Sequence, residues 1–181
     1  MMVRWLVIVL MLAGVSIDNQ ASAASLNIVS MGASFTFGTG RGANYGTGVT
    51  NPAETYPAQL EAMLRQKGLD VSVKNAGVPG DTTEQIFERL DSTVADGTQL
   101  VTLEPSYGND RQQGVDTTQA TAEILSRLRE RHIPCIVLDH ALTTSIWNNP
   151  TYMNGNHPNA AGHALMARSL YPRVLAALKK H

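Results

Sequence analysis

The chain has 181 residues, of which 43% are hydrophobic and 16% are charged, and its formal net charge is −1 at pH 7. This length suits a single domain with one core, and the composition excludes a disordered chain. The near-neutral charge, without a long basic run, argues against a nucleic-acid partner.

The first 25 residues differ from the rest of the sequence. Arg4 precedes an apolar run from Trp5 to Val15, and Ala21-Ser22-Ala23 has the small-x-small pattern of a signal-peptidase site. We therefore expect residues 1–23 to be a cleaved signal and residues 24–181 to form one periplasmic or secreted domain. The apolar run is too short to span a bilayer and no cysteine lies near the cleavage site, so we expect no stable membrane anchor.

The first predicted strand ends close to a serine. Its apolar residues run from Ile28 to Met31 and stop at Gly32, and Ser34 follows two residues later. Catalytic groups of α/β proteins gather beyond the carboxyl ends of parallel strands, which makes Ser34 a candidate nucleophile. The G-x-S pattern lacks the second glycine of the usual nucleophile elbow, and it also fits an ordinary turn hydroxyl.

A glycine-rich segment from Gly38 to Gly48 comes next. Its first part, Gly38–Ala43, satisfies the dinucleotide-binding pattern G-x-G-x-x-G/A. It begins well past the strand, no helix follows promptly, and the next predicted strand ends in Asn75 rather than in an acidic residue. We therefore expect a long loop beside Ser34 and no nucleotide site.

Strands and helices then alternate along the chain. Strands are predicted at 71–74, 100–103 and 135–138; helices are predicted at about 56–67, after Thr82 with Gln85 in a capping box, after Asp116 or Thr117, and after Asn159 with a break or kink at Pro172. This order predicts an α/β fold with three α/β/α layers, a flavodoxin-like, doubly wound parallel sheet of four to five strands.

Two details of the later chain are less regular. Cys135 is the single cysteine, so it has no internal disulfide partner, and its apolar surroundings indicate a small core residue. The segment between Asp139 and Asn154 is too short for a full strand and crossover helix. We expect Thr143–Trp147 to be a remnant edge strand or an irregular loop.

Four short blocks carry a resemblance to a known family. They are MGAS at 31–34, NAGVPGDT at 75–82, GND at 108–110 and NGNHPNAAGH at 154–163. Found in this order and at the ends of the predicted elements, they resemble the SGNH (GDSL-type) hydrolases, which are exported esterases and thioesterases. The resemblance implies hydrolysis of a small-molecule ester or thioester, with no metal and no cofactor.

The resemblance also implies a role for each site residue. Ser34 is the expected nucleophile and His157 the expected base. The backbone N–H groups of Ser34 and Gly80 and the side-chain amide of Asn109 form the expected oxyanion hole, in which each donor contributes about 3 kcal/mol. The residues alone leave other readings open, because Gly80 also suits a turn, Asn109 an Asx-turn and His157 a helix entrance.

A metal site is a further alternative that the sequence disfavours. His140, His157 and His163 follow no fixed ligand spacing and have no acidic partner.

Two positions depart from the family pattern. The usual aspartate before the nucleophile is Ala33, and the usual triad aspartate, three residues before His157, is Asn154. Asparagine has no charge with which to stabilise an imidazolium, and the same replacement in serine proteases costs about 10⁴ in rate. Two hypotheses follow: a serine hydrolase with weakened activity, or a degenerate protein that binds acyl or glycan ligands without turnover.

Overall fold

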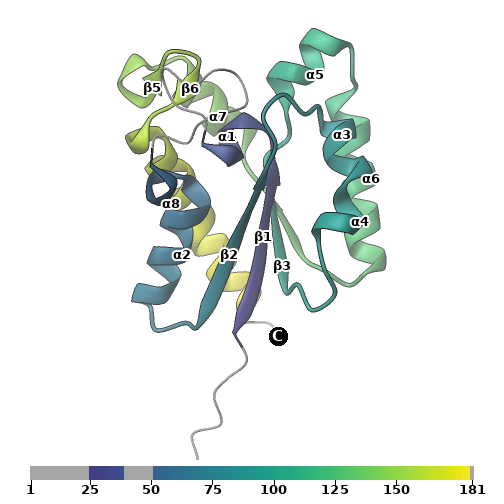
Figure 1. The fold of residues 1–181 in the computed structure, drawn as a ribbon, viewed down its shortest axis with the longest axis vertical. Coiled ribbons are helices and arrows are strands. Elements are labelled where there is room, and N and C mark those ends of the chain that lie inside the picture. Colours follow the sequence, from purple (N-terminus) through teal and green to yellow (C-terminus); the bar gives the residue numbers. More distant parts are fainter. Residues whose placement is uncertain (1–24, 39–50, 180–181) are drawn as a thin grey trace, which may run out of the picture.

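The computed structural model describes residues 25–38 and 51–179 (Figure 1). The expected signal at 1–23 and most of the glycine-rich segment lie outside the described residues.

A four-stranded parallel sheet forms the centre of the described fold, with the strand order β2-β1-β3-β4. The strands are β1 (Leu26–Gly32), β2 (Val71–Gly77), β3 (Leu100–Leu103) and β4 (Cys135–Val137). Because β1 lies between β2 and β3, the chain leaves the middle of the sheet just before Ser34. The predicted doubly wound parallel sheet is confirmed with four strands.

Helices cover both faces of the sheet (Figure 1). The helices α2 (Tyr56–Gln66) and α8 (Ala160–Leu178) pack on one face, and α3 (Thr83–Glu88), α4 (Leu90–Thr93) and α6 (Thr117–Glu130) pack on the other. Successive residues of a strand point to opposite faces, so Ile28 joins the cluster with Leu60 and Leu170, whereas Val29 joins the cluster with Ile124. These two apolar clusters hold the three layers together.

Three helices begin at the capping residues that the sequence predicts. The Thr82 side chain accepts from the backbone N–H of Gln85, whose side chain accepts from the Thr82 N–H, so the predicted capping box is confirmed. The Asp116 side chain caps α6 and the Asn159 side chain caps α8 by accepting from backbone N–H groups of the first turn. The single helix predicted after Thr82 is divided into α3 and α4.

The sequence predicts a break or a kink at Pro172, and the break is wrong, because α8 continues through this residue to Leu178. A proline inside a helix removes one hydrogen bond and costs about 3 kcal/mol. Leu170 and Val174, on either side of Pro172, are fully buried in the core. Their burial offsets the lost bond.

The expectation of an edge strand or loop at Thr143–Trp147 is also wrong. These residues belong to a helix, α7 (His140–Trp147), in which the Asp139 side chain accepts from the Ala141 N–H. Leu142 and Ile146 lie one turn apart and pack on the core. The segment is too short for another strand with its crossover, but it is long enough for a helix alone.

The remaining elements gather at the carboxyl end of the sheet (Figure 1). They are α1 (Ser34–Phe37), α5 (Tyr107–Gln113), the short 3₁₀ helices η1 (Pro52–Glu54) and η2 (Pro150–Tyr152), and a separate antiparallel pair of β5 (Met153–Asn154) with β6 (His157–Pro158). Within the described residues, no helix is long and apolar enough to cross a membrane.

Candidate active site

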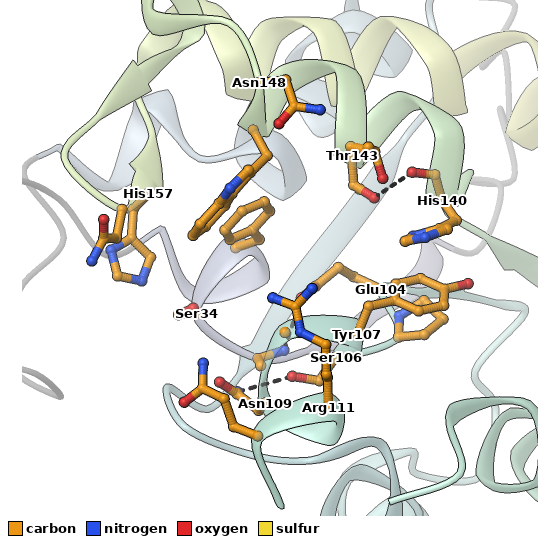
Figure 2. A pocket seen from close by; sticks show the side chains of 18 residues that line it. Ser34, Glu104, Ser106, Tyr107, Asn109, Arg111, His140, Thr143, Asn148 and His157 are labelled. Carbon is orange, nitrogen blue, oxygen red and sulfur yellow. Dashed lines mark hydrogen bonds between the residues drawn. The ribbon is translucent and has the colours of Figure 1, made fainter. Parts of the chain in front are cut away.

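A cavity of about 640 Å³ lies between α1, α5 and α7 at this end of the sheet (Figure 2). Ser34, Asn109 and His157 all line it. Ser34 begins α1 directly beyond β1, Asn109 lies in α5 beyond β3, and His157 belongs to β6. In Figure 2, Ser34 lies between the other two side chains. Three segments far apart in the sequence therefore meet at one cavity.

Glu104 holds the backbone immediately before Ser34. Its Oε2 accepts from the Ala33 N–H at 2.9 Å and from the Thr36 hydroxyl at 3.0 Å. The carboxyl approaches so closely that a Cβ built on Gly32 would lie 2.6 Å from Oε2, which explains the glycine at the end of β1. Burial raises the pKa of Glu104 to about 7, and the nearby charge of Asp110 acts in the same direction.

The Asn109 amide donates both of its hydrogens within the protein. One goes to the Asp81 carbonyl at 2.8 Å and the other to Ser106 Oγ at 2.9 Å (Figure 2). Ser106 lines the same cavity. An oxyanion bound there would therefore take the place of Ser106 as the acceptor for Asn109.

Gly80 belongs to the turn that precedes α3. Its φ of +90° lies in the left-handed region, which favours glycine. It is not among the described residues that line the cavity, and its N–H remains a predicted oxyanion donor.

The buried Asp110 and the partly buried Arg89 tie the site loops to each other. Asp110 accepts from the Thr83 N–H at 2.7 Å and from the Thr117 hydroxyl at 2.6 Å, which joins the starts of α3 and α6 to α5. Arg89 pairs with Asp81 at 2.7 Å and donates to the Gly32 carbonyl at 2.9 Å. These bonds fix the loop that holds Gly80 against the end of β1.

His157 is 9% exposed, and burial lowers its pKa. A lowered pKa keeps the imidazole neutral at pH 7, as a group that accepts a proton from serine must be. The His157 ring packs edge-on against Phe35, with 6.2 Å between the ring centroids. Phe35 in turn stacks with Trp147, with 6.1 Å between the ring centroids. Trp147 is 51% exposed and lines the cavity.

Asn154 pairs directly with His157 in the register of β5 and β6. It lines a second cavity of about 240 Å³, together with Glu54 and His163. Burial lowers the pKa of His163 to about 4, the nearby His157 adds to the effect, and His163 Nδ1 accepts from the Tyr56 N–H at 3.3 Å.

Sequence reasoning missed three residues of this site. Arg89 lies between α3 and α4, Trp147 ends α7, and neither carries a local motif, so their roles depend on the fold. Glu104 does carry a signal, because an acidic residue directly follows the apolar strand 100–103, at the same sheet edge as Ser34.

Comparison with known proteins found relatives by structure. No protein-family model matches the chain, and no curated protein matches it in sequence. A variant of the esterase AlinE4 is 30% identical with a TM-score of 0.53, over 64% of this chain and 59% of that one. The matched part thus spans less than two thirds of that relative.

Other solved structures align along nearly their whole length. AlinE4, an SGNH-hydrolase family esterase, has a TM-score of 0.59 at 24% identity, covering 86% of this chain and 98% of the other. TesA has a TM-score of 0.69 at 19% identity, covering 83% and 99%. The chain therefore shares the fold of these SGNH (GDSL-type) hydrolases, and its four sequence blocks, in order, resemble the same family.

Proposed function

We propose that this protein is an exported serine hydrolase that cleaves carboxylic esters or thioesters through an acyl-Ser34 intermediate. The observation that carries the proposal is the meeting of Ser34, Asn109 and His157 around one cavity.

The reaction begins when Ser34 Oγ attacks the carbonyl carbon of the substrate while His157 takes the serine proton. The carbonyl π electrons move to its oxygen, and the resulting oxyanion is bound by the N–H groups of Ser34 and Gly80 and by the Asn109 amide. When the oxyanion collapses, the bond to the alcohol or thiol breaks, and the leaving group takes the proton from His157. Water then attacks the acyl-serine by the same steps and releases the acid.

The local structure supports these roles. The neutral His157 can accept a proton at pH 7, because burial lowers its pKa. The bonds of Glu104 to Ala33 and Thr36 fix the backbone on both sides of Ser34, so the nucleophile needs little reorganisation before attack.

A binding protein without turnover is the second candidate function. Asn154, in place of an aspartate, favours this candidate, because it offers no negative charge to an imidazolium at His157.

Hydrolysis of short p-nitrophenyl esters tests the proposal. The wild-type chain should release nitrophenolate, and Ser34→Ala should lose nearly all of this activity while its circular dichroism spectrum stays unchanged. Ser92→Ala is a matched control, because Ser92 is an exposed serine of α4 far from the cavity in sequence and structure. Unchanged turnover in Ser34→Ala would refute the assignment of the nucleophile.

A further inference from the structure

One face of α7 forms a wall of the site cavity. His140, Thr143, Thr144 and Trp147 recur at the spacing of successive helical turns, and all four line the cavity. Leu142 and Ile146 hold the other side of α7 on the core. The half-exposed indole of Trp147 is therefore a fixed apolar surface beside Ser34.

Arg111 contributes a positive charge to the same cavity. Figure 2 shows its side chain extending from α5 into the cavity, toward the region between Ser34 and Tyr107. The side chain is exposed. Within the described residues it forms no ion pair and no hydrogen bond, in contrast to Arg89 and Arg127, which are paired with aspartates.

The carboxylates near Arg111 accept hydrogen bonds from other groups of the protein. Asp110 is fully buried and accepts from Thr83 and Thr117. Glu104 is the one acidic residue among the described residues that line the cavity, and its Oε2 is bonded to Ala33 and Thr36. In the described part of the chain, the guanidinium of Arg111 in this cavity therefore has no carboxylate paired with it.

We propose that the cavity selects esters that carry a carboxylate, which binds to the Arg111 guanidinium while an apolar part of the substrate packs on Trp147. Guanidinium is suited to this role because its planar donors match both oxygens of a carboxylate. This inference rests on the proposed ester hydrolysis and adds a substrate class to it.

Matched ester pairs test the selectivity. Mono-4-nitrophenyl adipate and its methyl ester differ by one charge on the acyl side, and 4-acetoxybenzoate and its methyl ester differ by one charge on the alcohol side. In the wild type, kcat/KM for the anionic ester should exceed that for its neutral methyl ester at least about tenfold in one of the two pairs. The pair that shows this preference tells whether the recognised carboxylate belongs to the acyl side or to the alcohol side of the substrate. Because the attraction is electrostatic, added salt should reduce the preference.

The variant Arg111→Gln should lower the anionic-to-neutral ratio of kcat/KM about tenfold in the preferred pair. Arg129→Gln is the matched control, because Arg129 is an exposed arginine of α6 that does not line the cavity, and its ratio should equal that of the wild type. A ratio that Arg111→Gln leaves unchanged in both pairs would overturn the inference. Hydrolysis of the neutral esters would still support the proposed function.

A binding measurement decides the inference even if no ester is turned over. In Ser34→Ala, monomethyl adipate should quench tryptophan fluorescence with a Kd at least about tenfold lower than that of dimethyl adipate. The difference should disappear in the Ser34→Ala/Arg111→Gln double variant. Equal affinities for the two ligands in Ser34→Ala would contradict a carboxylate subsite.

Discussion

Asn154 lies directly opposite His157 in the antiparallel pair of β5 and β6. Residues opposite each other in such a pair have Cβ atoms about 4.5–5.5 Å apart and side chains on one face. The two-residue connection, with Gly155 at a φ of +66°, fixes this register. A carboxylate at position 154 would therefore be close to the imidazole.

We predict that Asn154→Asp raises kcat toward short esters at least about tenfold. The aspartate would orient the ring and stabilise the imidazolium, whereas the asparagine amide can favour the wrong tautomer. Initial rates with p-nitrophenyl acetate provide the measurement. Asn148→Asp, which places the same charge elsewhere on the cavity wall, should not reproduce the gain. An equal or lower rate in Asn154→Asp would mean that another group already serves His157.

The Asn109 amide is the second point at which activity can be tested. Asn109→Ala should lower kcat about 10²-fold by deleting one oxyanion donor, with a smaller effect on KM. Gln112→Ala, which removes another amide from the same cavity, should stay close to the wild type. If Asn109→Ala retained wild-type kcat, the amide would serve only to hold Asp81 and Ser106.

Glu104 should make the stability of the fold depend on pH. Its pKa rises from the model-compound value of 4.5 to about 7 on folding, because the carboxyl is buried. Below pH 4.5 the carboxyl is protonated in both the folded and the unfolded chain, so its titration does not reduce the free energy of unfolding. As the pH rises to 7, the unfolded chain loses this proton first, and the free energy of unfolding falls by about 3 kcal/mol.

Urea unfolding of wild type and Glu104→Gln at pH 4.5 and pH 8 measures this effect. Relative to the wild type, the variant should gain about 3 kcal/mol between the two pH values, since glutamine does not titrate. His163 also makes stability depend on pH: its pKa is lowered to about 4 on folding, so the free energy of unfolding falls as the pH falls from 6.5 to 4. This contribution is the same in both proteins, so it cancels when their free energies of unfolding are subtracted. A constant difference would show that Glu104 is not buried in this way.

The amino terminus gives a prediction that is independent of catalysis. Material exported by a bacterial host should begin at Ala24, because the small residues Ala21 and Ala23 follow an apolar run. Intact-mass measurement of the exported protein tests this directly. A mass that still includes residues 1–23 would indicate an uncleaved anchor.

The parallel sheet was predictable because each strand is a short apolar run followed by a polar loop, as at Ile28–Met31 before Ser34. Helix starts were predictable where a side chain caps them, as Thr82 does. The helix α7 was not, because its apolar residues Leu142 and Ile146 are too few to establish a period before the core they pack on is known. The continuation of α8 through Pro172 likewise depends on tertiary burial, which overrides local propensity.

Some residues of the site could likewise be predicted from the sequence, and others could not. Ser34, Asn109 and His157 stand in recognisable blocks, and the strand order explains why they meet. Arg111 and Trp147 become part of the cavity only through the positions of α5 and α7.

The central claim is that Ser34 is an activated nucleophile, and covalent labelling with a fluorophosphonate tests it most directly. We predict that the wild-type chain is labelled on the peptide that contains Ser34, that His157→Ala is labelled far more slowly and that Ser34→Ala is not labelled. A wild-type chain that stays unlabelled, or that carries the label on another residue, would contradict the account.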